Sequence, residues 1–388
     1  MSTLSLPLPE IARHFQVRQD VTFLNHGSYG ACPRPVFEVY QQWQRQIEDQ
    51  PVEFFGRRVQ GHLAEARAAL GEMLHVPASD LVYVPNATHG INIVARSLSF
   101  GPRDEILATD HEYGAVDRTW RFLCQERGAT YINQPVDLPL SDPQQVIDQL
   151  WAGVTPRTKI IAISHITSPT ALTFPVAAIC QKAREHGILT VIDGAHAPGQ
   201  MELDLAAIGA DFYTGNCHKW LCSPKGAAFL YARPEVQQLL KPLVVSWGYE
   251  SMTPSGSTFQ DYFSWTGTAD PSAYLTVPAA IAFQREHNWP AVREACHALA
   301  VEARNRVAAL TGMAHVCPDT PEWWSQMCIL PMPSDPEIQL KRLWEEYRIE
   351  APITTWRDQR FVRISVQAYT TPADIDRLVA AIAAVLDS

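Results

Sequence analysis

The stretch Ile188–Gly199, ILTVIDGAHAPG, is an apolar and β-branched run that leads into two polar residues, Asp193 and His196. A short run of this kind predicts a buried strand, and the small residues that follow it predict a turn. In open α/β sheets, ligands bind at the carboxyl ends of the strands. The stretch therefore predicts both an α/β fold and a place where a site can form.

A second stretch of the same kind, Asp211–Trp220 (DFYTGNCHKW), leads into a turn that carries His218 and Lys219. Because Lys219 follows Asp193 by about one strand-to-strand crossover, we expect both side chains at the same rim of the sheet. An isolated aspartate before glycine is usually a turn or cap residue, and an isolated lysine is usually a surface charge. Only the pair favours a functional site.

On both sides of these stretches, short β-branched runs alternate with longer amphipathic segments, which is the pattern of a parallel sheet covered by helices. We expect strands at Glu105–Thr109, Thr130–Asn133, Lys159–Ser164, Ile188–Asp193, Asp211–Thr214 and Gly226–Tyr231. We expect helices at Gly114–Arg127, Asp142–Trp151 and Val176–His186. This part of the chain is predicted to be an α/β domain.

The remainder of the chain predicts a long loop and a second, smaller domain. Ser246–Pro271 lacks a clear period, and a loop of this length is usually functional or interfacial. A long helical stretch, Ala273–Thr311, follows it. An alternating α+β set comes last, at Met327–Leu330, Ile338–Tyr347, Phe361–Val366 and Pro372–Leu386. We therefore predict an N-terminal segment (1–20), a large domain that carries the site (21–270) and a small C-terminal domain (271–388).

Composition narrows the classes of partner. The 388 residues carry 31 Lys and Arg against 41 Asp and Glu, a formal net charge of −10 without a long basic run, which argues against nucleic acid and anionic membranes. Met1–Glu10 lacks the pattern of a signal peptide, so we expect a cytoplasmic location. The eight cysteines form neither a CxxC pair nor a metal-type cluster, which predicts reduced thiols and no metal site.

Pyridoxal phosphate needs a lysine for a Schiff base, an acid against the pyridine nitrogen and donors for its phosphate. Lys219 and Asp193 supply the first two. The polar turn Asn86–Gly90 (NATHG) lies between the predicted strand Leu81–Val84 and a helix that begins near Ile91. Backbone N–H groups at such a helix start bind phosphate well. The sequence thus predicts pyridoxal 5′-phosphate as the cofactor.

Seven motifs carry a resemblance to a known family: LNHGSYGACPRPV (24–36), NATHGIN (86–92), TDHEYGA (109–115), SHITSPTAL (164–172), DGAHAPG (193–199), GNCHKWL (215–221) and RFVRISVQAYTT (360–371). The chain resembles the class V aminotransferase family of fold-type I pyridoxal-phosphate enzymes, and within it the bacterial isopenicillin-N-epimerase-like subgroup. The resemblance implies a large domain with a mostly parallel seven-stranded sheet and a smaller α+β C-terminal domain.

The resemblance also implies roles at the cofactor. Lys219 matches the Schiff-base lysine, which would also move the α-proton of the substrate. Asp193 matches the partner of the pyridine nitrogen, and His196 matches the residue that hydrogen-bonds the phenolic oxygen. Further cofactor contacts are implied for Ala87, Thr88, Ser168, Asn216 and His218. Either His111 or Tyr113 matches the residue that stacks on the pyridine ring, and the motif does not separate them.

Substrate and subunit contacts are implied in the same way. Arg363 matches the arginine that clamps the substrate α-carboxylate, although without the resemblance it is typical of a salt-bridged strand residue. Asn25 and His26 lie where similar enzymes border the substrate, and their alternative role is an N-terminal turn. Thr268 matches a residue that reaches the phosphate of the neighbouring subunit, which implies a homodimer with shared active sites.

The cofactor alone does not name the reaction. Cysteine desulfurases of this family carry a nucleophilic cysteine before the arginine, and Ala351–Phe361 has none, which leaves Cys328 as the remaining candidate. The resemblance favours an epimerase or racemase that acts at Cα of an amino-acid-like small molecule, with a C–S β-lyase or an aminotransferase as alternatives. Epimerisation requires a second acid or base opposite Lys219, for which Tyr113 and His111 are the candidates.

Overall fold

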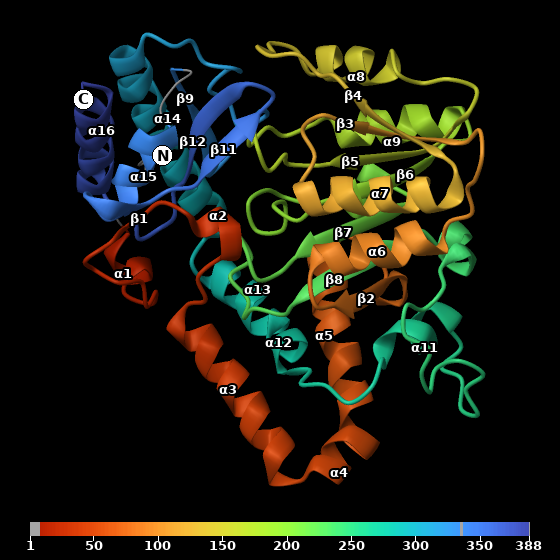
Figure 1. Ribbon diagram of the computed structural model, residues 1–388. Coiled ribbons are helices and arrows are strands. Elements are labelled where there is room, and N and C mark those ends of the chain that lie inside the picture. The colour runs from red at the N-terminus through yellow and green to blue at the C-terminus, as the bar shows by residue number, and fades with distance from the viewer. Residues whose placement is uncertain (1–7, 334–336, 388) are drawn as a thin grey trace.

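The structure of the protein is a computed structural model that describes residues 8–333 and 337–387. Residues 1–7 of the expected N-terminal segment lie outside the described residues. Figure 1 shows a large sheet flanked by helices, a smaller group of strands and helices from the C-terminal part of the chain, and two long helices that meet at a sharp bend.

A mostly parallel seven-stranded sheet forms the large layer, as predicted. Its order is β2-β8-β7-β6-β5-β3-β4, and only β8 runs antiparallel to its neighbours. The strands are β2 (Leu81–Val84), β3 (Glu105–Thr109), β4 (Thr130–Gln134), β5 (Thr158–Ser164), β6 (Leu189–Asp193), β7 (Phe212–Asn216) and β8 (Ala228–Ala232). The predicted strand bounds agree with these to within two residues at each end.

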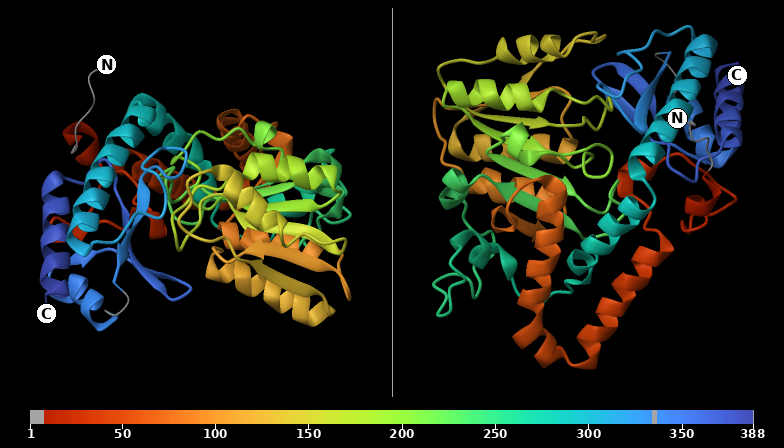
Figure 2. Two further views of the ribbon diagram at one scale, coloured as in Figure 1. Left: turned by 90° about the horizontal axis from the view of Figure 1, so that it is seen from above. Right: turned by 180° about the vertical axis from the view of Figure 1, so that it is seen from behind.

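Helices cover both faces of this sheet (Figure 2), which is why its strands read as continuous apolar runs. One buried apolar cluster joins the sheet to α6 (Ala87–Ser97) and α7 (Gly114–Arg127). A second cluster joins its other face to α8 (Pro143–Trp151) and α9 (Val176–Glu185). The side chains of β2 alternate between the two clusters, as the two-residue period of a strand requires.

The segment after the sheet differs from the prediction in two places. The expected loop Ser246–Pro271 contains a helix, α11 (Thr258–Ser264), which Ser257 caps. The expected helix Ala273–Thr311 is three helices, α12 (Ser272–Leu275), α13 (Val277–Glu286) and α14 (Trp289–Thr311). Asn288 takes a left-handed backbone conformation (φ 47°) and Pro290 occupies the first turn of α14, so one continuous helix is excluded there.

The small unit is built on a three-stranded antiparallel sheet, β11 (Ile353–Trp356), β12 (Gln359–Ser365) and β9 (Met327–Met332). Helix α14 packs against β9 and against α16 (Pro372–Leu386), and α15 (Glu337–Glu345) packs against α16. Near the start of the chain, β1 (Thr22–Phe23) pairs in parallel with β10 (Ile349–Glu350). Residues 22–23 therefore lie beside the C-terminal part of the chain. The domain boundaries at residues 20 and 270 stay a prediction.

The remaining elements are short, apart from the two long helices that meet at the bend. They are α1 (Pro9–Ala12), α2 (His26–Tyr29), α3 (Arg34–Asp49), α4 (Pro51–Glu53), a π turn (Phe54–Arg58), α5 (Val59–Leu74), a 3-10 turn (Ala78–Asp80), α10 (Leu205–Ile208) and a 3-10 turn (Pro234–Leu239). Helices α3 and α5 lie on either side of the bend at α4 (Figure 1).

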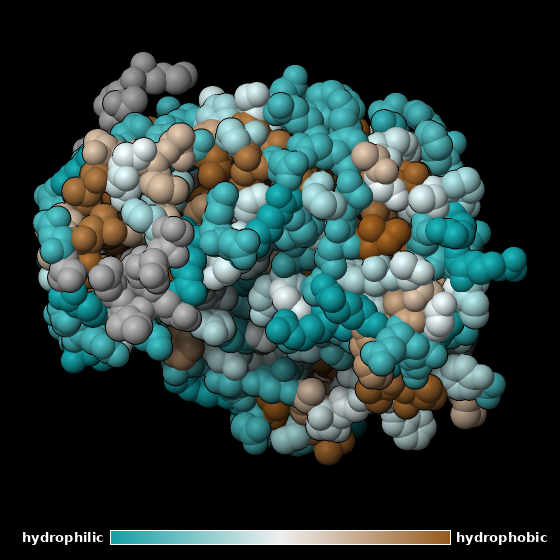
Figure 3. All heavy atoms as spheres, turned by 45° about the horizontal axis from the view of Figure 1, so that its top comes forward, coloured by the Kyte–Doolittle hydropathy of each residue, from teal (hydrophilic) through white to brown (hydrophobic). Residues whose placement is uncertain are grey.

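The surface is mostly polar on the face seen in Figure 3, with hydrophobic patches scattered over it. In the described ranges, none of the helices combines the length and the apolar character that crossing a bilayer requires. All eight cysteines are free thiols, and seven of them are buried.

Candidate active site

The site lies at one edge of the seven-stranded sheet, where β3, β5, β6 and β7 all have their carboxyl ends. Ser164, the last residue of β5, pairs with Asp193, the last residue of β6, and Asp193 pairs with Thr214 of β7. Lys219 follows β7 by three residues. Parallel pairing thus brings the predicted lysine and acid to the same rim, as the crossover spacing indicated.

Lys219 is a partly buried amine whose pKa is lowered. Its Nζ lies 3.2 Å from Nε2 of His196. Burial lowers the pKa of Lys219 to about 8, although the charge of Asp193 acts in the opposite direction, and the charge of Arg363 lowers it further. A lysine with this pKa is neutral in a much larger fraction of molecules near neutral pH than an ordinary lysine, and imine formation requires the neutral amine.

Asp193 is a buried carboxyl whose surroundings suit a protonated ring nitrogen. It is 5% exposed, and its Oδ1 accepts a hydrogen bond from the N–H of Ala195 at 2.9 Å. Burial raises its pKa, while Ala195 and the charge of Lys219 lower it. Within residues 8–333 and 337–387, no cationic side chain forms an ion pair with Asp193, so a cationic pyridinium would provide its missing partner.

His196 is held in one neutral tautomer. The indole N–H of Trp220 donates to its Nδ1 at 3.3 Å, and burial lowers the pKa of His196 well below its usual value. A neutral imidazole that accepts at Nδ1 carries its proton on Nε2. That N–H points to the Lys219 amine, where it can donate to the phenolic oxygen of a cofactor bound there.

Phosphate donors gather at the start of α6. Asn86 caps this helix by accepting from the N–H of His89, and Asn216 Oδ1 accepts from the N–H of Ala87 at 2.9 Å. In the described part of the chain, the N–H and hydroxyl of Thr88 and the amide NH₂ of Asn216 have no hydrogen-bond partner. These donors at a helix N-terminus match the chemistry of a phosphate group.

Two further features belong to this phosphate cradle. A Cβ on Gly90 would lie 2.4 Å from the Thr214 hydroxyl, so glycine allows α6 to approach β7 closely. His218 donates through Nδ1 to the carbonyl of Ala227 at 3.0 Å, and burial lowers its pKa to about 4. His218 is thus neutral before an anion binds.

Arg363 lies on β12, 5% exposed, and faces the sheet edge across the two parts of the molecule. Its Nη1 donates to the carbonyl and hydroxyl of Ser168 at 2.6 and 3.0 Å, and its Nη2 donates to the Ser28 hydroxyl at 3.3 Å. Its buried Nε has no partner in the part of the chain that the structure describes. A guanidinium with one edge fixed and a donor unused is suited to a carboxylate. Ser168, expected at the cofactor, therefore contacts Arg363.

The structure separates His111 from Tyr113. Both ring nitrogens of His111 have protein partners, with the Thr170 hydroxyl and the Val136 carbonyl each at 2.8 Å, and its ring stacks on Trp356. Tyr113 is the N-cap residue of α7 and is 47% exposed, and it lies close enough to Arg363 to raise the pKa of that guanidinium. Tyr113 is therefore the one of the two whose ring is free to face a ligand.

The two N-terminal candidates also differ. Asn25 accepts from the Ser28 hydroxyl at 2.5 Å, which places it one hydrogen bond behind the contact between Ser28 and Arg363. His26 is fully buried: Tyr369 donates to its Nδ1, and its Nε2 donates to the Lys219 carbonyl at 3.1 Å. Burial lowers the pKa of His26 to about 3. His26 supports the lysine backbone, and this position gives no support to the expected substrate contact.

Thr268 is exposed between α11 and α12, and none of the described hydrogen bonds links it to the cluster around Lys219.

The site also contains groups that sequence reasoning missed. Trp220 sets the tautomer of His196, Ser28 holds Arg363, and Glu112 is a buried carboxyl beside Asp193. Glu112 lies between His111 and Tyr113 in the motif TDHEYGA. An acid at this position was the sequence feature that could have identified it.

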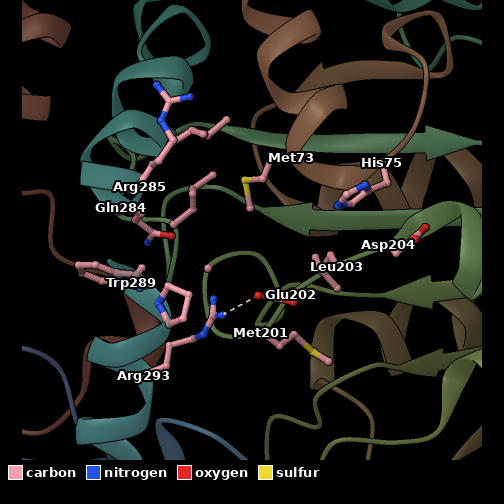
Figure 4. Close-up of a pocket in the computed structure, with 14 residues that line it drawn as sticks. Met73, His75, Met201, Glu202, Leu203, Asp204, Gln284, Arg285, Trp289 and Arg293 are labelled. Carbon is pink, nitrogen blue, oxygen red and sulfur yellow. Dashed lines mark ion pairs between the residues drawn. The ribbon is translucent and has the colours of Figure 1, made fainter. Parts of the chain in front are cut away.

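Behind the lysine turn lies a cavity of about 470 Å³ between α13, α14 and the segment after β6 (Figure 4). Gln284 lines it and donates to the carbonyl of Trp220 at 2.7 Å. Arg293 points across the cavity to Glu202, 3.7 Å away. None of the predicted site residues lines this cavity, so it is separate from the cluster around Lys219.

The residues present fit pyridoxal 5′-phosphate. An amine of lowered pKa, a buried acid without a cation, an imidazole N–H and unused donors at a helix start lie on one rim. When bound, this cofactor withdraws electrons from Cα of an amino acid. Arg363 lies within electrostatic range of the same lysine.

Comparisons with known proteins identify the family of the chain. Isopenicillin N epimerase of Streptomyces clavuligerus is 36% identical over 370 residues, covering 92% of this chain and 93% of that protein. Putative L-cysteine desulfhydrase 1 of Oryza sativa subsp. japonica is 30% identical over 402 residues, covering 92% and 82%. A solved mutant of C-DES, with glycine covalently linked to its PLP cofactor, has a TM-score of 0.81 at 21% identity and covers 96% of this chain and 98% of that chain.

The solved structure, at this identity, shows the fold, which is that of fold-type I pyridoxal-phosphate enzymes. A family model described as aminotransferase class-V matches residues 31–378. The chain therefore belongs to the aminotransferase class-V family and is an enzyme whose cofactor is pyridoxal 5′-phosphate.

Proposed function

We propose that the protein is an epimerase or racemase that inverts Cα of an amino-acid-like substrate. The observation that carries this proposal is the grouping of two proton-bearing side chains around one carboxylate clamp. Arg363 lowers the pKa of Lys219, and Tyr113 raises the pKa of Arg363, so all three lie within electrostatic range. Inversion needs a base on one face of Cα and an acid on the other.

In this mechanism the residues of the chain have separate tasks. Arg363 holds the substrate carboxylate, which orients the Cα–H bond toward Lys219. With pyridoxal 5′-phosphate bound, the amine of Lys219 would take the proton from one face. The hydroxyl of Tyr113 returns a proton to the other face. The sequence similarity to isopenicillin N epimerase over almost the whole chain supports this assignment.

A C–S β-lyase is the second candidate, because relatives named L-cysteine desulfhydrase also match most of the chain. Such a lyase would need the same lysine and the same clamp, and Tyr113 would protonate the leaving sulfur. A desulfurase that uses its own thiolate is disfavoured. Burial raises the pKa of all eight cysteine thiols, and Cys328, with a pKa of about 12, lies inside β9.

Product analysis in deuterated water tests the reaction. L-amino acids and cysteine conjugates are incubated with the holoenzyme, and α-deuteration, D-isomer and pyruvate are followed. We expect α-deuterated D-isomer, and none of these products with Lys219→Ala. In Tyr113→Phe we expect exchange of the L-isomer to persist while the D-isomer falls at least tenfold, within the range for loss of one acid–base group. Tyr347→Phe, which changes a half-buried tyrosine just beyond α15 and outside the cluster, is the control. Pyruvate without D-isomer would establish the lyase.

We also propose that the enzyme works as a homodimer. The segment before α11 exposes an unusual set of large apolar side chains, of which Trp247 is 85% exposed and Met252 is 98% exposed. Exposed apolar patches of this kind commonly mark subunit contacts. Thr268 lies just beyond the same helix, which suits the predicted reach into the partner's phosphate site.

Sedimentation of the holoenzyme tests the dimer. We expect a dimer for the wild type and dissociation for the double variant Trp247→Ser/Met252→Ser. Leu310→Ser, a change at an exposed leucine on α14, is the matched control and should leave the mass unchanged. A wild type that sediments as a monomer at micromolar concentration would refute the dimer.

A further inference from the structure

Glu112 is a buried acid that the proposed mechanism does not use. It lies between β3 and α7 and is 9% exposed. Its Oε1 accepts from the Thr109 hydroxyl at 2.6 Å, and its Oε2 accepts from the Ser164 hydroxyl at 2.7 Å. The Thr109 hydroxyl also accepts the N–H of His111 at 3.2 Å, which leaves its own proton for Glu112.

The charged surroundings of Glu112 are unfavourable. Along residues 8–333 and 337–387, no cationic side chain forms an ion pair with it. The titratable groups that face it are Asp193 of β6 and Tyr131 of β4, and the charge of Asp193 raises its pKa. Ser164 links the two acids, because it binds Glu112 through its hydroxyl and pairs with Asp193 in the sheet.

Two carboxyl groups in such an environment do not easily carry two negative charges. Burial is the main cause that raises the pKa of Glu112 to about 7, and Asp193 contributes, whereas the two hydroxyl donors lower it. Without the cofactor, Glu112 is therefore about half protonated near neutral pH. A cation placed against Asp193 would remove part of the electrostatic penalty.

We propose that Glu112 is a positioning residue for the cofactor ring, acting through Asp193, and that it releases its proton when the ring binds. The proton would pass to solvent and leave a second carboxylate near Asp193, which would hold the ring nitrogen. The second negative charge then helps to keep the ring nitrogen protonated, which the electron-withdrawing role of the cofactor requires. This proposal rests on the cofactor site and is independent of which reaction follows.

The coupling between Glu112 and the cofactor is reciprocal. If cofactor binding lowers the pKa of Glu112 by about one unit, then ionised Glu112 strengthens cofactor binding roughly tenfold. At a pH where Glu112 stays protonated in both states, the benefit disappears. A residue that only links β3 to β5 by hydrogen bonds would produce no such pH dependence.

Calorimetric titration of cofactor-free enzyme with pyridoxal 5′-phosphate tests the proposal. Measurements at pH 7 in two buffers of different ionisation enthalpy give the number of protons released. We expect Glu112→Gln to release about half a proton less than the wild type. Its cofactor affinity should be roughly tenfold weaker at pH 8 and nearly unchanged at pH 5.5. Equal proton release and a pH-independent affinity ratio would overturn the proposal.

Two further variants complete the design. Glu105→Gln changes a buried glutamate at the opposite end of β3, where Arg157 pairs with it, and should match the wild type in proton release. If Glu112→Gln does not fold, Ser164→Ala decides, because losing this donor raises the pKa of Glu112 and should increase proton release at pH 8, where Glu112 of the wild type is already mostly ionised. No increase in that variant would equally refute the proposal. Failure of the epimerase assignment, in contrast, would appear in the products and leave these proton counts unchanged.

Discussion

At the residue scale, the chemistry depends on which side-chain atoms are occupied by protein partners and which are left for ligands. Trp220 occupies Nδ1 of His196, so its Nε2 carries the proton. Ser28 and Ser168 occupy one edge of Arg363, so another donor stays unused. These contacts prepare the site before a ligand arrives, which reduces the ordering cost of binding.

Replacing Trp220 tests the tautomer argument. Trp220→Phe removes the donor to His196 and leaves a buried ring nitrogen unsatisfied, which costs about 1–3 kcal/mol. We expect the cofactor absorbance to change its pH dependence and kcat to fall. Trp120→Phe is a matched control, because the buried indole N–H of Trp120 has no partner among the described residues and loses only packing. Identical absorbance profiles for the two variants would contradict the assigned tautomer.

Arg363→Lys tests the carboxylate clamp. A lysine keeps the charge but loses the planar pair of donors, so we expect kcat/KM to fall about 100-fold, equivalent to about 2–3 kcal/mol. The cofactor absorbance should persist, because Arg363 holds substrate in this scheme. Arg306→Lys, at a surface ion pair on α14, should leave kcat/KM unchanged. An unchanged kcat/KM in Arg363→Lys would show that the carboxylate binds elsewhere.

At the element scale, the close approach of α6 to β7 builds the phosphate cradle. A methyl group at Gly90 would meet Thr214 at 2.4 Å, so Gly90→Ala must push the helix start away from the strand. We expect a loss of about 1–3 kcal/mol in the free energy of unfolding. Weaker cofactor binding should accompany it.

Gly61→Ala is the matched control for that helix. Gly61 lies inside α5 with no atom within 4 Å of the added Cβ. Replacing a helix glycine by alanine at an open position stabilises by about 0.5–1 kcal/mol. Opposite signs for the two variants in urea unfolding are therefore expected. A neutral or stabilising Gly90→Ala would contradict this argument, because it would show that a methyl group fits between α6 and Thr214.

At the scale of the whole molecule, several buried histidines are neutral, and this makes the fold sensitive to acid. Burial lowers the pKa of His26 to about 3 and the pKa values of His111, His165 and His218 to about 4. An unfolded histidine takes up a proton below about pH 6.5, whereas these do not. Their stabilising contribution is present above that pH and is lost as the pH falls from about 6.5 toward 4.

We expect the free energy of unfolding of the cofactor-free enzyme to fall between pH 7 and pH 5, by up to about 1.4 kcal/mol per pH unit for each such histidine. Glu112 has the opposite sign, since its raised pKa stabilises the fold at low pH and that contribution is lost as the pH rises toward about 7. Asp193, whose pKa burial also raises, acts in the same sense as Glu112. Two acids do not outweigh four histidines. Urea unfolding at the two pH values measures the difference, and equal or greater stability at pH 5 would contradict it.

Much of the fold was predictable, because it depends on local patterns. The apolar runs that precede Asp193 and Lys219 predicted strands whose bounds agree with the structure to within two residues. The break at Asn288 was missed, because helical periodicity continues across it while its backbone conformation reverses. Helix α11 was also missed, because a seven-residue helix is too short to show a helical period in the sequence.

The sequence by itself indicated the fold class through periodicity, and the spacing of Lys219 and Asp193 pointed to the cofactor. The resemblance carried by its motifs implied the role of Arg363. Only the tertiary structure decided that His111 is enclosed while Tyr113 is exposed, that His26 lies behind Lys219, and that Glu112 lies beside Asp193. These differences arise because side chains far apart in the sequence compete for the same hydrogen-bond partners. Such competition is settled only when β3, β5, β6 and β12 are packed together.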